Sequence, residues 1–244
     1  MKSTQKPALY TCLSPALLHL YDVTSSIVVV IDVLRATSTI AAALHNGAKQ
    51  IIPVDSVNEC IRIGKQLGAI TAGERDGKIA EGLEYGNSPF EYPESFIKGK
   101  TLVLTTTNGT KLLHMALQGG AKKIITGSFG NLSAVCEFLK KENKPVLLGC
   151  AGWKDRFNFE DTMFAGAVIS QIGSQFEIHC DASKMAVGVY NEAQPAFFDF
   201  MQEKQATHYH RLMQYGLEND IRHCLTPDTY PVLPIYKDGK LIQG

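Results

Sequence analysis

The stretch VVVIDVLRATST, residues 28–39, decides how this chain folds, because it places a buried strand directly before charged side chains. The aliphatic run Val28–Ile31 is typical of a strand that is covered on both faces of a sheet. Asp32 follows at once, and Arg35 comes three residues later, with hydroxyl residues behind it. Charges of both signs are costly in a dry core. We therefore interpret the end of this strand as an active site for a highly charged anion.

Apolar runs rich in Val and Ile alternate with helical patterns over most of the chain. Continuous apolar strands separated by helices are typical of a largely parallel sheet with helices on both faces. We predict an α/β protein with three layers, α/β/α. The predicted strands lie near Ile27–Leu34, Gln50–Val54, Ala69–Glu74, Thr101–Thr106, Lys123–Gly127 and Pro145–Cys150. The predicted helices lie near Ser38–His45, Val57–Leu67, Gly109–Leu117, Leu132–Glu142 and Glu160–Ile172.

The chain also repeats itself at an offset of 73 residues. AALHNGAKQIIPV, residues 42–54, matches MALQGGAKKIITG, residues 115–127, and both segments close a helix with a glycine before the next strand. Convergence on common turn chemistry would also give these glycines. We favour a duplicated strand–helix–strand unit, with repeats at approximately 27–74 and 101–150.

The offset places the segment DVLRAT on the segment TTTNGT, so Asp32 corresponds to Thr105 and Thr37 to Thr110. Both segments lie where a strand gives way to a helix. Open α/β sheets bind ligands outside the carboxyl ends of their strands. We therefore expect these two loops to face one shared crevice.

The last part of the chain changes character. Residues 181–225 have helical periodicity, with a break at Pro195. The final segment PDTYPVLPIYKDGKLI is extended, with a turn at Asp238-Gly239. No linker separates a second unit, so we predict a single α/β domain over residues 1–244.

The composition excludes several classes of protein. The 244 residues include 24 basic and 24 acidic side chains, which gives a formal net charge of zero. Proteins that coat nucleic acid usually carry a basic excess. The start of the chain lacks the apolar stretch of a signal peptide, and no segment approaches the roughly 20 apolar residues of a membrane span. The six cysteines form no C-x-x-C pair. We expect a cytoplasmic protein with reduced thiols that binds neither nucleic acid nor membrane.

Asp32 and Arg35 are the first candidate functional pair. A helix cap or a salt bridge that fixes a loop would also explain them. A carboxylate at the mouth of a buried strand is nevertheless rigidly aimed, as a magnesium ligand should be. The neighbouring arginine offers the forked donor geometry that suits phosphate.

The second candidate is TTTNGT, residues 105–110, which leads directly into a predicted helix. The glycine allows a tight turn, so that backbone N–H groups can converge on an anion at the start of the helix. A plain threonine cap is the alternative. The candidate anion-binding residues of this loop are Thr106, Thr107, Asn108, Gly109 and Thr110.

The third candidate is the glycine-rich, mixed-charge segment AGERDGKIAEGLEYGNSPFEY, residues 72–92. A long loop of this kind after a core strand often carries function. Glu74 ends the strand, and Arg75 and Lys78 follow it. Asn87 and Ser88 could serve as donors or only cap another helix.

The fourth candidate is CAGWKDRFNFEDT, residues 150–162, which again follows a strand. Glu160 and Asp161 open the next helix, where acidic residues are favoured by the helix dipole in any case. Alternatively, one or both complete a Mg²⁺ site with Asp32. His208 and His210 cannot share a helical face, which argues against a metal site there. Trp153 is expected to pack beneath its own loop.

Together these motifs resemble those of one family, the magnesium-dependent 2-phosphosulfolactate phosphatases. The resemblance rests on DVLRATST, AGERDGK with YGNSP, LTTTNGT and AGWKDRFNFEDTMFAG, continues through LENDIRHC and covers nearly the whole chain. The sequence departs from the family pattern at Ser38, where a third threonine is usual. It departs again at Leu83-Glu84, where an aromatic residue and an aspartate are expected.

The resemblance implies a phosphoric monoester hydrolase that converts 2-phosphosulfolactate to sulfolactate and inorganic phosphate with Mg²⁺, a step of coenzyme M biosynthesis. Such a substrate carries a phosphate, a carboxylate and a sulfonate on three carbons, so it needs several cationic contacts. The sequence leaves open whether the chain forms a homo-oligomer.

On this interpretation, Asp32 with Glu160 or Asp161 holds Mg²⁺ against the phosphate. Arg35 and the helix start at residues 108–110 bind the phosphate oxygens. Glu74 is the candidate base for the attacking water. Arg75 and Lys78 would meet the carboxylate and the sulfonate.

Two alternatives remain open at this stage. The first is a phosphatase of another small phosphorylated acid, such as phosphoglycolate. The second is a non-catalytic module that binds an anionic metabolite, although binding alone does not require the carboxylates Asp32, Glu74, Glu160 and Asp161.

Overall fold

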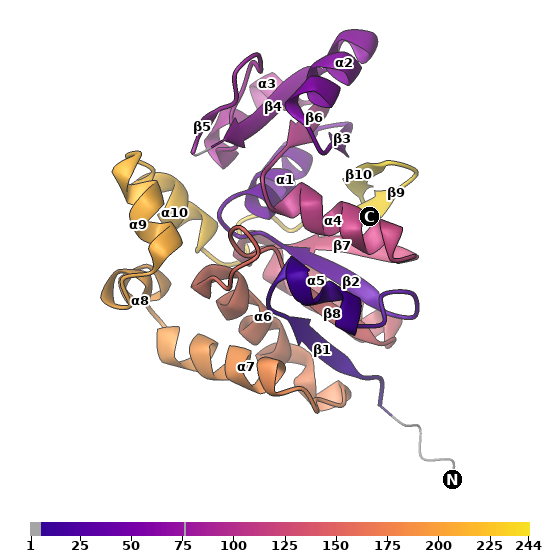
Figure 1. Ribbon diagram of the computed structural model, residues 1–244, viewed down its shortest axis with the longest axis vertical. Helices are drawn as coiled ribbons and strands as arrows, with labels where there is room; N and C mark the ends of the chain where they lie inside the picture. The colour runs from indigo at the N-terminus through magenta and orange to yellow at the C-terminus, as the bar shows by residue number, and fades with distance from the viewer. Residues whose placement is uncertain (1–5, 76) are drawn as a thin grey trace.

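The computed structural model describes residues 6–75 and 77–244. In these residues, ten strands form one sheet in the order β1-β8-β2-β7-β9-β10-β3-β6-β4-β5 (Figure 1). Neighbouring strands are parallel except where β5, β9 or β10 takes part. The predicted α/β class, with a largely parallel sheet and a helical C-terminal part, is confirmed.

The strands are β1 (Leu9–Cys12), β2 (Ile27–Ile31), β3 (Gln50–Pro53), β4 (Ile70–Arg75), β5 (Lys78–Ile79), β6 (Thr101–Thr105), β7 (Lys123–Gly127), β8 (Val146–Cys150), β9 (Pro234–Lys237) and β10 (Lys240–Gln243). The α-helices are α1 (Ala36–His45), α2 (Val57–Leu67), α3 (Glu94–Ile97), α4 (Gly109–Gln118), α5 (Leu132–Glu142), α6 (Phe159–Ile172), α7 (Asp181–Ala193), α8 (Phe197–Glu203), α9 (Thr207–Gln214) and α10 (Glu218–Cys224). Short 3₁₀ helices cover Pro15–Leu20, Pro89–Glu91, Phe129–Asn131 and Gly173–Gln175.

The strand β2 ends at Ile31, three residues before the predicted end at Leu34. The chain turns there because Thr37 closes the loop on Asp32. The Thr37 hydroxyl accepts a hydrogen bond from the Asp32 N–H at 3.1 Å, and the Thr37 N–H donates to the Asp32 carbonyl oxygen at 2.9 Å. The helix α1 therefore starts two residues earlier than the predicted Ser38.

The aliphatic run of β2 is buried on both faces, as the sequence predicts. Val29 and Ile31 pack into one core cluster with α5 and α6. Val28 and Val30 pack into a second cluster with α1 and α4 on the other face. This alternation explains why the strand carries no polar residue before Asp32.

The strands fall into two groups, with α1 and α4 between them (Figure 1). One group contains β1, β8, β2 and β7, and the other contains β3, β6, β4 and β5. The helix α1 leads from β2 in the first group to β3 in the second, and α4 leads from β6 in the second group back to β7 in the first. The chain therefore crosses between the two groups twice, once through α1 and once through α4.

The elements of the two halves recur at the offset found in the sequence. The helix α4 begins and ends 73 residues after α1. Both helices are followed by a glycine in a left-handed conformation, Gly47 with φ +89° and Gly120 with φ +87°. Only glycine adopts this conformation without strain. A common origin of the halves stays a prediction, and these correspondences support it.

The hairpin β9–β10 joins the two groups into one sheet. Ile235 of β9 pairs with Ile125 of β7, and Leu241 of β10 pairs with Ile51 of β3. The hairpin turns at Asp238-Gly239, where both residues have positive φ, which confirms the predicted turn.

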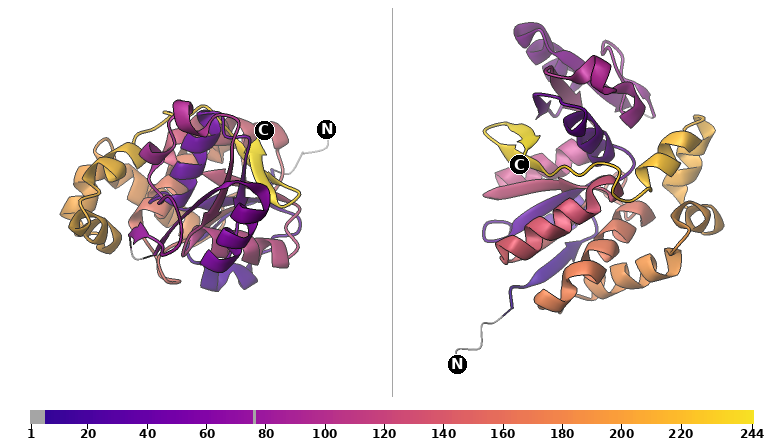
Figure 2. Two further views of the ribbon diagram at one scale, coloured as in Figure 1. Left: turned by 90° about the horizontal axis from the view of Figure 1, so that it is seen from above. Right: turned by 180° about the vertical axis from the view of Figure 1, so that it is seen from behind.

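The helices α8, α9 and α10 lie beside both groups of strands (Figures 1 and 2). The break between α7 and α8 falls at Pro195, as predicted. None of the described helices is long and apolar enough to cross a membrane.

The helices α6 and α7 cross at Gly166, where a methyl group would meet the Ala186 carbonyl oxygen at 2.1 Å. We predict that Gly166→Ala lowers the free energy of unfolding by about 2 kcal/mol, because two backbones must separate. Gly188→Ala in α7 is the control, since a methyl group there meets no atom within 4 Å. It should stabilise the protein by about 0.5–1 kcal/mol through helix propensity. Urea unfolding of both variants checks this, and equal effects would contradict the close crossing.

Candidate functional site

The carboxyl ends of β2, β4 and β6 meet beside α9 at a small cavity of about 20 Å³. The residues that line it are Asp32, Leu34, Arg35, Glu74, Asn87, Asn108, His208, Arg211 and Leu212. Five of them belong to the predicted site: Asp32, Arg35, Glu74, Asn87 and Asn108. They come from loops far apart in the chain, as the crevice inferred from the repeat requires.

Asp32 is buried at the start of the cavity, with 7% of the residue exposed. Burial raises the pKa of Asp32 from its ordinary value of 3.8 to about 6. The nearby His208 offsets part of this rise, whereas Glu74 and Glu160 add to it. Several acidic side chains are therefore close enough to repel one another, which is a setting that a cation would relieve.

The start of α4 lies directly against Asp32. A methyl group on Gly109 would meet Oδ2 of Asp32 at 2.7 Å. The glycine therefore lets the first turn of this helix approach the carboxylate. Thr106 and Thr110 close the preceding loop, since the Thr110 N–H donates to the Thr106 hydroxyl at 3.2 Å and the Thr110 hydroxyl donates to the Thr106 carbonyl oxygen at 2.7 Å.

Glu74 is held between two loops. Its Oε1 accepts a hydrogen bond from the Thr107 hydroxyl at 3.1 Å, and its Oε2 accepts one from the Gly77 N–H at 3.0 Å. Asn108 of the same loop accepts a hydrogen bond from the Lys154 N–H at 3.2 Å. The loop after β6 thereby connects the carboxylate of β4 to the loop after β8.

Arg35 forms a buried ion pair with Asp220 of α10 through its Nη1, and the two side chains are 6% and 9% exposed. The second carboxylate oxygen of Asp220 accepts a hydrogen bond from the Ser88 hydroxyl at 3.1 Å. Ser88 also caps the short helix that follows it. Asn87 lines the cavity, and its side-chain oxygen is buried without a hydrogen-bond partner.

Glu160 is completely buried, and its Oε1 lies 2.5 Å from Nδ1 of His208. Its other oxygen, Oε2, is buried without a hydrogen-bond partner. Glu160 and His208 also line a neighbouring cavity of about 240 Å³ between α9 and the loop after β8. An unpaired buried carboxylate oxygen is costly, so Glu160 is a strong candidate for a ligand that the chain itself does not supply.

Asp161 has its oxygens occupied by the chain. It accepts hydrogen bonds from the N–H of Val33 at 2.8 Å, the N–H of Gly152 at 3.0 Å and the side-chain amide of Asn158 at 3.0 Å. Burial raises the pKa of Asp161, and the nearby Glu160 and Asp32 raise it further. Its role as a metal ligand stays a prediction, and these contacts make Glu160 the better candidate.

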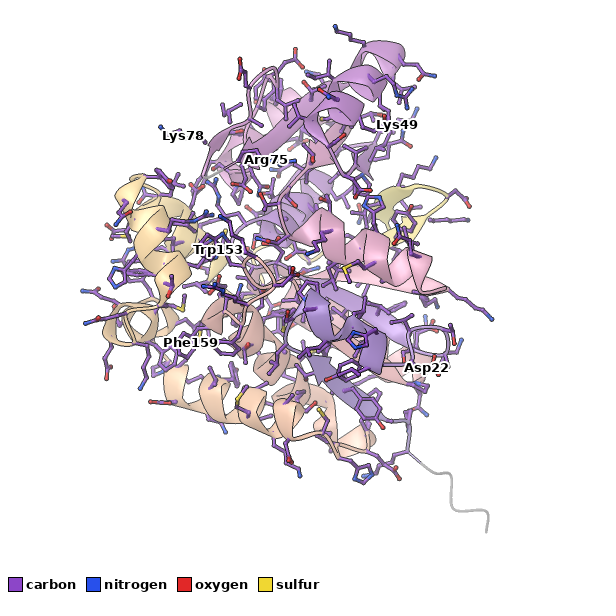
Figure 3. The ribbon with its side chains drawn as sticks, in the orientation of Figure 1. Asp22, Lys49, Arg75, Lys78, Trp153 and Phe159 are labelled. Atoms are coloured by element: carbon purple, nitrogen blue, oxygen red, sulfur yellow. The ribbon has the colours of Figure 1, made fainter. Side chains whose placement is uncertain are left out.

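Arg75 and Lys78 are not among the residues that line the cavity. Arg75 donates to the Glu74 carbonyl oxygen at 2.7 Å and to the Thr105 hydroxyl at 3.1 Å. Lys78 is exposed on β5, at the edge of the sheet (Figure 3). Their contact with substrate stays a prediction.

The residues His208, Arg211 and Asp220 were not predicted from the sequence. The spacing of His208 from His210 argues against a metal site formed by both histidines. His208 instead contacts Glu160, without His210. Asp220 lies within the LENDIRHC motif, which was the one signal that could have found it. Trp153 was expected to pack beneath its own loop. Its ring also contacts Arg211 of α9, whose guanidinium carbon lies 4.9 Å from the ring centre.

Among the described residues, no group of three or more His, Cys, Asp or Glu side chains is arranged to hold a metal ion. Magnesium needs fewer protein ligands, because it keeps several waters and binds substrate phosphate together with one or two carboxylates. Asp32 and the unpaired oxygen of Glu160 are carboxylate ligands of the kind that Mg²⁺ prefers. The site thus combines carboxylates, guanidinium groups and a helix start, which suits a phosphorylated anion.

Comparisons with known proteins point to one family. A sequence model described as 2-phosphosulpholactate phosphatase matches residues 12–239. The chain is 40% identical to a probable 2-phosphosulfolactate phosphatase of Caldanaerobacter subterraneus, over 89% of this chain and 90% of that protein. It is 40% identical to a protein of the same name from Thermotoga maritima, over 88% of this chain and 90% of that protein. A protein of that name from Clostridium acetobutylicum is 39% identical, over 88% and 91%.

The buried pair of Arg35 and Asp220 gives a prediction about stability. Asp220→Ala leaves the guanidinium buried without this partner, so the free energy of unfolding should fall by about 3–5 kcal/mol. The exposed pair of Glu218 and Arg222 on the same helix is the control, and Glu218→Ala should change stability by about 0.5 kcal/mol or less. The double variant with Arg35→Met and Asp220→Leu should lose less than Asp220→Ala alone. Denaturant unfolding measures all three, and a small loss in Asp220→Ala would contradict a dry ion pair.

Proposed function

Because the chain belongs to the 2-phosphosulfolactate phosphatase family, we propose that it hydrolyses 2-phosphosulfolactate to sulfolactate and inorganic phosphate with Mg²⁺. The observation that carries the proposal is the cavity that brings Asp32 and Glu74 together with Arg35 and Arg211 at the start of α4. This arrangement has both the acidic groups for a divalent cation and the basic groups for a multiply charged substrate.

The phosphate binds between Arg35 and the start of α4. The Arg35 guanidinium is fixed by Asp220, so it keeps its orientation without substrate. The Thr110 N–H donates to the Thr106 hydroxyl, and the other first N–H groups of α4 have no partner within the helix and favour an anion. Donors that are fixed in advance stabilise the charge that develops on the phosphoryl oxygens at no reorganisation cost.

Asp32 and Glu160 would hold the magnesium ion. Asp32 is aimed by the hydrogen bonds that close the β2–α1 loop, and Oε2 of Glu160 lies buried without a partner. A Mg²⁺ ion held by these carboxylates would neutralise negative charge on the phosphate. Asp161 positions this pair, since its three donors fix the loops on either side.

Glu74 is the base for the attacking water. The Thr107 hydroxyl and the Gly77 N–H fix both of its oxygens, so the carboxylate keeps one orientation toward the cavity. The water oxygen forms a bond to phosphorus as the bond from phosphorus to the ester oxygen breaks. The proton of the water passes to Glu74, and the leaving alkoxide becomes the hydroxyl of sulfolactate after it takes up a proton.

We place the protein in the cytoplasm, in keeping with its thiols. All six cysteines are free, and five of them are buried. Burial raises the pKa of Cys12 to about 11 and that of Cys136 to about 12, which keeps both thiols protonated and unreactive at neutral pH.

Release of inorganic phosphate tests the proposed activity. The purified protein should release phosphate from 2-phosphosulfolactate in the presence of Mg²⁺ and only slowly from phosphoglycolate. Asp32→Asn should lower kcat/KM at least about 100-fold, because it removes a charge that acts on the transferring phosphoryl group. Faster turnover of phosphoglycolate would support the phosphatase of another acid. No release from any phosphorylated acid with metal present would support the anion-binding module.

The metal site can be tested without measuring activity. Mg²⁺ should raise the thermal unfolding midpoint of the wild type, because a ligand that binds only the folded state stabilises it, by about 2.7 kcal/mol at one hundred times Kd. The rise should be absent in Asp32→Asn and clearly smaller in Glu160→Gln. Glu137→Gln, at an exposed carboxylate of α5, should respond as the wild type does. An unchanged response in Glu160→Gln would remove Glu160 from the metal site.

A further inference from the structure

The segment that carries Asn87 is fixed by its neighbours. The Thr39 hydroxyl of α1 donates a hydrogen bond to the Asn87 carbonyl oxygen at 2.9 Å. On one side, the Tyr92 hydroxyl donates to the Gly86 carbonyl oxygen at 2.7 Å. On the other side, the Ser88 hydroxyl donates to a carboxylate of α10 at 3.1 Å. These contacts hold the backbone of Asn87 in one position.

The side chain of Asn87 lines the cavity together with Asp32, Arg35 and Glu74. Asn87 is 3% exposed, and its side-chain oxygen has no hydrogen-bond partner in the part of the chain that the structure describes. A buried amide oxygen without a donor is costly. This oxygen is therefore suited to accept a hydrogen bond from a group that the chain does not supply.

The backbone brings Asn87 and Glu74 to the same cavity. Ala72 of β4 forms a parallel bridge with Tyr85, and the Gly73 N–H donates to the Tyr85 carbonyl oxygen at 3.0 Å. Glu74 lies two residues after one end of this bridge, and Asn87 lies two residues after the other. Both side chains line the cavity. Two hydrogen-bond acceptors thus meet there, one on β4 and one on the segment beside it.

These two acceptors can orient a water molecule. The Thr107 hydroxyl and the Gly77 N–H each bond one oxygen of the Glu74 carboxylate, and each oxygen can accept a second hydrogen bond. The cavity of about 20 Å³ has room for a water molecule, which needs about 10–15 Å³. A water that donates one proton to each acceptor turns a lone pair of its oxygen away from both. Attack on phosphorus requires such a fixed lone pair.

We propose that Asn87 is a catalytic residue that orients the attacking water together with Glu74. The proposal rests on the proposed phosphatase function and adds a residue to it. The side-chain oxygen of Asn87 accepts one O–H group of the water, and Glu74 accepts the other. The sequence predicted Asn87 as a donor to the substrate, whereas here it acts on the water.

The reaction step then balances as follows from the two contacts. The water oxygen forms a bond to phosphorus while the bond from phosphorus to the ester oxygen breaks. One proton of the water passes to Glu74, and the other stays on the phosphate that forms. The leaving alkoxide takes up a proton from solvent water.

Asn87→Ala should lower kcat for 2-phosphosulfolactate with Mg²⁺ about 100-fold, because the water loses its orientation. It should change KM less than about twofold, since the substrate itself loses no contact. Asn87→Leu keeps a branched side chain of similar shape and should show the same loss. A rise in KM that accounts for the whole loss would overturn the proposal in favour of an ordinary contact with the substrate.

Thr126→Val is the matched control. Thr126 lies on β7, is 1% exposed and has a buried hydroxyl without a hydrogen-bond partner among the described residues, but it does not line this cavity. The substitution should leave kcat and KM unchanged. Thermal unfolding should show no lower midpoint in Asn87→Leu or in Thr126→Val, because neither change removes a hydrogen bond within the chain. A lower midpoint in both Asn87 variants would overturn the proposal, because the side chain would then support the fold.

The double variant with Glu74→Gln and Asn87→Ala tests whether both residues act on one water. Residues that act as a unit have losses that do not multiply. The double variant should therefore have a kcat within about threefold of that of Glu74→Gln alone. Losses that multiply would overturn the proposal, because the two side chains would then act on different groups.

Exchange of oxygen between water and ¹⁸O-labelled inorganic phosphate separates this proposal from the proposed function. With Mg²⁺ present, Asn87→Ala should exchange about 100-fold more slowly than the wild type and should bind inorganic phosphate equally tightly by calorimetry. Equal exchange in both proteins, or phosphate binding that weakens by the same factor, would overturn the role of Asn87. Exchange that depends on Asn87 without hydrolysis of 2-phosphosulfolactate would refute the proposed substrate and keep this role. A wild type that neither exchanges oxygen nor hydrolyses any ester would refute both.

Discussion

Three N–H groups converge on the carboxylate of Asp161, and the rest of the site depends on this arrangement. Val33 belongs to the loop after β2, Gly152 to the loop after β8, and the third donor to the start of α6. Buried donors without an acceptor would each be costly in an interior closed to water. The same contact fixes Asp32 and Glu160, because each is the chain neighbour of a residue that takes part. The Asp161 carboxylate thus holds together the loops of the site, because each of them donates a hydrogen bond to it.

Much of the fold could be predicted because its signals are local. The helices Val57–Leu67 and Leu132–Glu142 have the predicted bounds, since a serine cap or a closing asparagine in a left-handed conformation marks one of their ends. The strand Leu9–Cys12 was not predicted, because its short sequence carries no strong pattern and its pairing with β8 is a tertiary contact. The end of β2 was placed three residues too late, because apolar Val33 and Leu34 continue the run although the chain has already turned.

The site residues that lie at strand ends within the repeated units could be predicted from the sequence. Asp32 and Asn108 follow strands and Glu74 lies at the carboxyl end of one, so the rule for open sheets brings them together. His208 and Asp220 lie on helices outside the repeated units, and their partners Glu160 and Arg35 are 48 and 185 residues away in the chain. The spacing of residues within one helix does not predict a contact with a residue so distant in the sequence. The C-terminal helices therefore complete a site whose frame the N-terminal units provide.

The hairpin β9–β10 has a consequence for the order in which the sheet can form. The strands β7 and β3 are joined in the sheet through this hairpin, and its residues 234–243 are synthesised after every other strand. Without the hairpin, the other described strands would form two sheets with open edges at β7 and β3. Open edges are templates for pairing with other chains. The two groups of strands can therefore join into one sheet only after residues 234–243 are available for pairing, and until then both edges need protection from other chains.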